Sequence, residues 1–178
     1  MGIAACKGLG IKMIGIDSND FINKVPHMIL GCLWQTIRMA LTKKISLKDT
    51  PEIMKLAEEG EELKDLLKLQ PEAILIRWLN YHLKKAGQDK KVTNLGKDLQ
   101  DSTVLFHVLN QLDAAKCPLD GINDEDLASR AGKMISNSQA IGVPDICGAN
   151  DIVTCNTKIN TIFVANIFNT KHGLEELT

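Results

Sequence analysis

Residues 71–87 read PEAILIRWLNYHLKKAG, and they predict one well-terminated amphipathic helix over residues 71–86. Pro71 and Glu72 stand in its first turn, and Lys84 and Lys85 stand in its last turn. A proline and an acid suit the start of a helix, whereas bases suit its end. Apolar side chains at helical spacing then form one core stripe: Leu75, Trp78, Leu79 and Leu83. A stripe of this width predicts a helix that packs against others in a folded domain.

The same signals recur along the chain and predict an all-α fold. Further helices are expected over 26–42, 51–59, 60–69, 101–113, 124–141 and 158–170, separated by glycine and proline breaks. In the stretch 101–113, Asp101 or Ser102 is expected to cap the helix. No segment shows the strict alternation of a half-buried strand.

Length and charge narrow the classes of function. A chain of 178 residues forms one domain, or one domain with additions. Its net charge of −1 does not favour a nucleic-acid binder that relies on phosphate contacts. The five cysteines are odd in number and contain no C-x-x-C pair, which favours a reducing, intracellular setting without a zinc site. The N-terminus lacks the long apolar core of a signal peptide.

The stretch 24–41, KVPHMILGCLWQTIRMAL, is apolar on most of its circumference. His27, Gln35 and Arg38 interrupt it, and it falls short of the usual transmembrane length. Three outcomes are open for this helix: it frays in dilute solution, it packs on the domain that follows, or it packs on the same helix of a second copy of the chain. In an ordered state, we expect the following domain or a second copy to cover its Leu30, Leu33, Trp34 and Ile37 face.

An internal repeat relates residues 9–37 to residues 141–168. Both copies carry Asp followed by two apolar residues, then a basic residue that opens an apolar helix: His27 in the first copy and Lys158 in the second. Because the second copy ends a domain that begins near residue 70, the first copy is expected to end an earlier domain whose body is absent. The expected organisation is a C-terminal remnant over 1–42, a linker over 43–69 and a complete domain over 70–178.

The linker range 43–69 is rich in charge and poor in aromatic residues. It predicts a partly helical connection between the two domains. Its glutamates Glu58, Glu59, Glu61 and Glu62 are interpreted as a solvated helix face rather than a cation site.

Several stretches resemble the fimbrin (plastin) family of actin-bundling proteins. PEAILIRWLNYHLKKAG (71–87), VTNLGKDLQDSTVLFHVLNQL (92–112) and IVTCNTKINTIFVANIFN (152–169) resemble the second calponin-homology domain of that family's tandem pair. VPHMILGCLWQTIRMAL (25–41) resembles the last helix of the first such domain. The resemblance implies a calponin-homology helical bundle that binds actin filaments in the cytoplasm, with the first domain as a partner in cis.

In related tandem domains, the closing helix of the first domain and the opening helix of the second contribute to the actin surface. By this resemblance the expected actin-binding residues are His27, Met28, Leu30, Cys32, Gln35, Arg38, Met39, Lys43, Lys44, Glu72 and Arg77. Trp34 and Trp78 are expected to be core residues instead.

A catalytic role is not favoured. His27, His82, His107 and His172 have no Cys or Ser partner at the spacing of a known motif. The chain contains no Walker sequence and no H-E-x-x-H, and DGINDEDL (120–127) lacks the closing glutamate of a calcium loop. We expect no cofactor, no metal, no nucleic acid and no membrane partner.

Two functions therefore stay open on sequence grounds. One is filament binding within an actin cross-linking protein. The other is a calponin-homology scaffold or regulatory module with little actin affinity of its own. The chain is expected to be monomeric, with possible self-association through the helix over 26–42.

Overall fold

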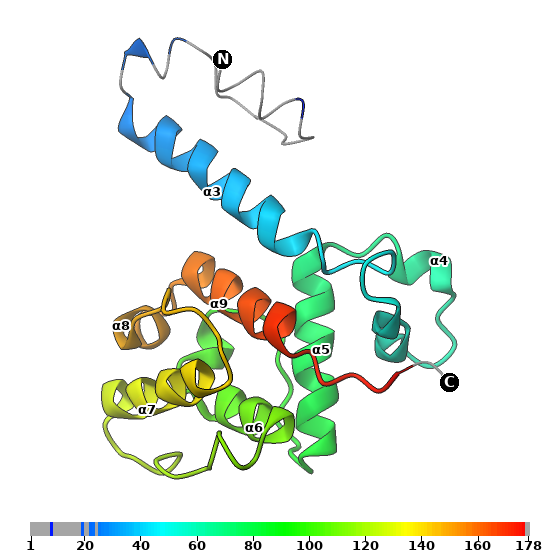
Figure 1. Ribbon diagram of the computed structural model, residues 1–178, viewed down its shortest axis with the longest axis vertical. Coiled ribbons are helices and arrows are strands. Elements are labelled where there is room, and N and C mark those ends of the chain that lie inside the picture. The colour runs from blue at the N-terminus through cyan, green and yellow to red at the C-terminus, as the bar shows by residue number, and fades with distance from the viewer. Residues whose placement is uncertain (1–7, 9–18, 20–21, 24, 177–178) are drawn as a thin grey trace. The chain divides into compact units, whose positions relative to one another are not determined.

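The computed structural model describes residues 8, 19, 22–23 and 25–176 (Figure 1). It divides into two compact units, Met1–Lys43 and Lys44–Thr178. Every regular element within the described residues is a helix, which confirms the predicted all-α class. Residues 9–18, 20–21 and 24 of the first copy of the predicted repeat lie outside the described residues.

In the first unit, the helix whose whole length is described is α3 (Pro26–Thr42). Pro26 occupies its first turn, where the missing amide proton costs nothing, and Val25 precedes it in an extended conformation. The hydroxyl groups of Thr36 and Thr42 donate to the carbonyl oxygens one turn back, those of Cys32 and Arg38. The bounds of α3 are those of the helix predicted over 26–42.

Helix α5 (Pro71–Lys85) organises the second unit, as Figure 1 shows in green. It packs against α6 (Thr103–Leu112), α9 (Thr157–Thr170) and the 3-10 helix η1 (Pro51–Leu56). Trp78 is fully buried, together with the three phenylalanines Phe106, Phe163 and Phe168. Each buried apolar side chain of this size contributes about 1.5–3 kcal/mol. The predicted core role of Trp78 is thus seen directly.

Two further helices complete the bundle. Helix α7 (Leu127–Ala140) packs against α6 and against the short α8 (Ala149–Val153). Asp126 caps α7, because its carboxylate accepts from the amides of Ala128 and Ser129. At the start of α6, Ser102 holds the cap position with φ of 60°, while the Asp101 carboxylate accepts from the amide of Thr103.

The segment after α9 lies along α5. The carbonyl oxygen of His172 accepts from the indole N–H of Trp78 at 2.7 Å and lies 2.9 Å from Nε2 of His82. Leu174 is buried. Gly173 has φ of 60°, and a Cβ there would meet Leu112 Cδ2 at 2.5 Å, so only glycine fits this close approach.

The range expected as a linker packs with the second unit from Lys44 onward. Its regular elements are η1 and a single turn, α4 (Leu63–Leu66), so the helices predicted over 51–59 and 60–69 are shorter than expected. Ile53, Leu56 and Leu66 are nonetheless buried. The sequence pattern also missed α8 and the 3-10 helix η2 (Lys97–Leu99), because each is too short to show a period.

Candidate functional site

Four of the expected actin-binding residues share one face of α3. Met28, Cys32, Gln35 and Met39 follow one another at spacings of four, three and four, which places them in one row along a helix. Cys32 is buried, and the other three are half-buried. The groups that this row exposes are therefore the thioethers of Met28 and Met39 and the amide of Gln35, whereas the thiol of Cys32 is buried.

The remaining candidates of this unit flank that row or follow it. His27 is exposed and Arg38 is half-buried. Lys43 is the C-cap of α3, and Lys44 begins the second unit; both are exposed, and neither has an ion pair with another described residue. The C-terminal end of a helix favours cations, so these two lysines are stable there as unpaired charges.

The apolar face of α3 is unevenly exposed. Leu30 and Leu33 are 64% and 53% exposed, whereas Trp34 and Ile37 are half-buried. The expectation that another surface covers these leucines, either the following domain or a second copy of the chain, stays a prediction.

The two candidates on α5 lie on different faces. Glu72 is in the first turn, and Arg77 is five residues later, about 140° around the helix. Arg77 donates two hydrogen bonds to the Glu61 carboxylate, at 2.5 Å from Nη1 and 3.0 Å from Nη2. A weaker contact joins Arg77 Nε to Glu58 at 4.0 Å. Arg77 thus binds two glutamates from the range expected as the linker of this chain.

The Arg77–Glu61 pair is largely withdrawn from water, with side chains 20% and 15% exposed. The Arg77 hydrogen bond is the main cause that holds the pKa of Glu61 below its ordinary value, and the amide of Glu58 adds to it. The same bond raises the pKa of Arg77. The interpretation of this acidic cluster as a solvated helix face is therefore wrong for Glu61, because a cation on α5 captures it, and residues 57–62 are not helical.

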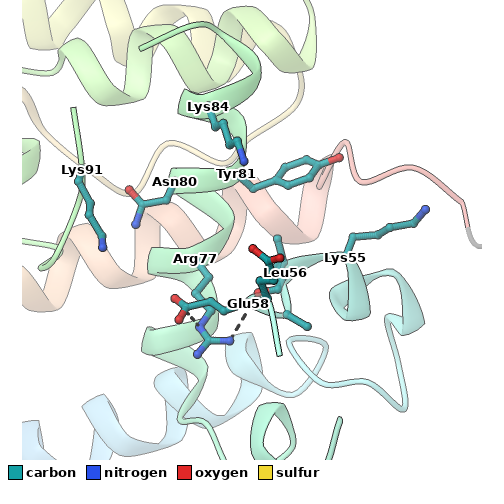
Figure 2. A pocket seen from close by; sticks show the side chains of 10 residues that line it. Lys55, Leu56, Glu58, Arg77, Asn80, Tyr81, Lys84 and Lys91 are labelled. Carbon is teal, nitrogen blue, oxygen red and sulfur yellow. Dashed lines mark hydrogen bonds and ion pairs between the residues drawn. The ribbon is translucent and has the colours of Figure 1, made fainter. Parts of the chain in front are cut away.

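A surface groove of about 360 Å³ lies beside this pair, between η1, the loop that follows it and α5 (Figure 2). Its lining is mixed in charge and consists of Lys55, Leu56, Ala57, Glu58, Glu59, Arg77, Asn80, Tyr81, Lys84 and Lys91. Figure 2 shows Lys84 and Lys91 toward one end and the Arg77–Glu58 contact toward the other. This groove could not be predicted from the sequence, since no periodicity links Glu61 to a base sixteen residues later.

One of the four histidines, His82, lies in the core of the second unit. His82 is buried among Trp78, Tyr81 and the His172 carbonyl, and burial is the main cause that lowers its pKa to about 4. Within the described residues, no three His, Cys, Asp or Glu side chains lie close enough to hold a metal ion together. None of the described helices has both the length and the apolar character needed to cross a bilayer.

Comparison with known proteins places this geometry in a family. Residues 69–173 match the family model of the calponin homology (CH) domain. Fimbrin of Saccharomyces cerevisiae is 39% identical over 175 residues, which are 98% of this chain and 27% of that protein. Human Plastin-1 is 36% identical over 178 residues, covering 96% of this chain and 28% of that protein.

A solved structure agrees with the sequence matches. The crystal structure of the actin-crosslinking core of Schizosaccharomyces pombe fimbrin gives a TM-score of 0.77 at 33% identity, covering 94% of this chain and 32% of that one. The chain thus spans little more than a quarter of the length of its curated relatives. These matches confirm the resemblance drawn from the sequence: the chain belongs to the calponin homology (CH) domain family, as a relative of the fimbrins and plastins.

Proposed function

We propose that this chain binds actin filaments and takes part, without catalysis, in the cross-linking of filaments. The observation that carries the proposal is the likeness, over 94% of the chain, to a fimbrin fragment described as an actin-crosslinking core. The proposed partner implies a location at the actin filaments of the cytoplasm.

The surface features of the chain suit a protein partner. The α3 row of Met28, Gln35 and Met39 supplies adaptable contacts, and Arg38, Lys43 and Lys44 supply a basic end. Protein interfaces combine an apolar centre with a charged rim of this kind. The net charge of −1 gives no matching attraction for nucleic acid.

A second candidate function is a scaffold or regulatory module with little actin affinity of its own. The observation that favours it is the pairing of Arg77, an expected actin-binding residue, because its guanidinium already donates two hydrogen bonds to Glu61. Under this alternative, the chain is a folded helical module that does not follow filaments into a pellet.

Co-sedimentation separates the two. The purified chain is centrifuged at high speed with and without actin filaments, at about 0.05 M and about 0.3 M salt. Filament binding predicts a filament-dependent pellet that shrinks at the higher salt, because exposed charges are screened. A chain that stays in the supernatant at low salt, yet shows full helical circular dichroism, supports the scaffold function instead.

A further inference from the structure

The loop over residues 57–62 joins η1 to α4 and packs weakly onto α5. All of its residues are exposed except Glu61. The flanking elements are anchored independently, since Ile53 and Leu56 on one side and Leu66 on the other are buried. The attachment of the loop itself therefore depends mainly on the Arg77–Glu61 ion pair. A segment with so few buried contacts opens locally without unfolding its domain.

When the Arg77–Glu61 pair holds the loop on α5, which we call the closed state, the loop also determines the charge of the groove. Glu58 and Glu59 line the groove from the loop side. Lys84 and Lys91 line it from α5 and the segment that follows, and neither has an ion pair with another described residue. When the loop leaves, its carboxylates leave with it. The remaining charged lining is then wholly cationic: Lys55, Arg77, Lys84 and Lys91.

The chemistry of the exposed site is specific for carboxylates. The planar guanidinium group of Arg77 already binds one carboxylate through two parallel N–H donors. A carboxylate from outside the chain fits the same fork, and further acidic side chains from that partner reach the two lysines. An acidic protein segment thus matches the open groove in both charge and donor geometry.

We propose that Glu61 substitutes internally for a carboxylate of the actin filament, so that loop 57–62 limits the access of an acidic filament segment to the groove lined by Arg77, Lys84 and Lys91. The inference rests on the proposed function, and it adds a regulation to it. The apparent affinity for filaments is reduced by the fraction of chains in which the loop is closed.

Two substitutions release the loop but leave the groove with different charges. Glu61→Gln removes the carboxylate and keeps Arg77 free as a cation. Arg77→Gln removes the cation as well. Glu62→Gln is the matched control, because it makes the same change of charge at an adjacent exposed residue that pairs with Lys64 rather than with Arg77.

The experiment measures co-sedimentation of these chains with purified actin filaments, together with hydrogen exchange of the amides of residues 57–62 in the free chains. Faster exchange of the loop is expected in both Glu61→Gln and Arg77→Gln, and not in Glu62→Gln. The affinity for filaments is expected to rise roughly two- to fivefold in Glu61→Gln and to fall below that of the unmodified chain in Arg77→Gln.

The outcomes distinguish this inference from the function on which it rests. If the unmodified chain binds filaments and Glu61→Gln loosens the loop without raising affinity, the inference is overturned and the proposed function stands. If Arg77→Gln binds as tightly as Glu61→Gln, the groove is not a filament contact and the inference is again overturned. If none of the four chains binds filaments, the proposed function fails and the inference falls with it.

Discussion

The indole N–H of Trp78 donates to the carbonyl oxygen of His172 at 2.7 Å, joining two residues that are 94 positions apart. The same carbonyl lies 2.9 Å from Nε2 of His82, one turn further along α5. One backbone oxygen thus holds the last described segment of the chain on the central helix. Because the two ring nitrogens are buried, each needs this partner.

Trp78→Phe tests that connection. It removes the donor and part of the fully buried ring, so the free energy of unfolding is expected to fall by about 2–4 kcal/mol. Urea unfolding followed by far-ultraviolet circular dichroism measures it. Glu175→Gln is the control, since it breaks only the exposed Lys85–Glu175 pair on the same segment and is expected to cost much less. Equal losses in the two variants would contradict the role given to the Trp78 bond.

His82 predicts a pH dependence of stability. Its pKa is lowered from 6.5 to about 4, chiefly by burial and also by Lys85. Between these values the unfolded chain binds a proton that the folded chain does not, so stability is constant above about pH 6.5 and falls as the pH drops toward 4. The contribution reaches about 1.4 kcal/mol per pH unit.

His82→Gln is expected to flatten that slope, because the amide can still donate to His172 but does not titrate. Unfolding is measured between about pH 5 and pH 7, where the carboxylates with lowered pKa values stay ionised. The control is His107→Gln, because His107 is half-exposed and its pKa is also lowered, mainly by burial. If the free energy of unfolding still falls with pH in the His82 variant but no longer does so in the His107 variant, then His107 rather than His82 causes the pH dependence.

Ile53 and Met54 test whether η1 contributes to the stability of the second unit. The two neighbours share one element, but Ile53 is 0% exposed and Met54 is 42% exposed. Ile53→Ala is expected to lower the free energy of unfolding by about 2–5 kcal/mol, whereas Met54→Ala is expected to change it by less than about 0.5 kcal/mol. If thermal unfolding shows the two variants to be equal, η1 is a connection rather than a part of the core.

The long helices could be predicted because each one carries its own signals. Pro71, Glu72 and the terminal lysines mark α5 at both ends, and the apolar spacing identifies Trp78 and Leu79 as core residues. The resemblance to fimbrins then rested on these helices, and the comparisons agree with it. Signals of this kind lie within the helix itself, so they predict the helix without any knowledge of the tertiary packing.

The Arg77–Glu61 pair could not be predicted, because its partners are joined by tertiary packing alone. Glu61 lies in a run of glutamates, and nothing in the run distinguishes it from Glu58 or Glu62. The buried residues of η1 bring this run to α5, and there one carboxylate meets an arginine. The surface that covers Leu30 and Leu33 could not be predicted for a related reason, since a pattern shows which face is apolar but not what lies against it.

Charge reversal of Lys43 and Lys44 tests the basic end of the proposed filament surface. Lys43→Glu with Lys44→Glu changes the net charge from −1 to −5 and is expected to weaken filament binding roughly three- to tenfold. Co-sedimentation at low salt measures the effect. Lys97→Glu with Lys116→Glu gives the same net charge at two other exposed residues. Equal weakening by both double variants would mean that net charge, rather than this site, governs binding.

The exposed leucines of α3 lead to a prediction about self-association. In the register of the internal repeat, His27 aligns with Lys158, which places Leu30 at the position of Thr161 and Leu33 at the position of Val164. Both equivalents in α9 are buried, whereas both leucines are more than half exposed. Two leucines at such positions gain several kcal/mol when another surface covers them.

A second copy of the chain is the partner available in a purified sample. The sequence favours a monomer, but the two exposed leucines favour reversible association of the unmodified chain, which sedimentation velocity over a range of concentrations measures. Leu30→Lys with Leu33→Lys is expected to shift it to monomer, because the charged groups cannot be buried unpaired. Leu67→Lys, at a leucine of the second unit that is 61% exposed, is expected to leave association unchanged. If the unmodified chain stays monomeric at every concentration, or if Leu67→Lys abolishes association as fully as the double variant, then α3 is not the self-association surface.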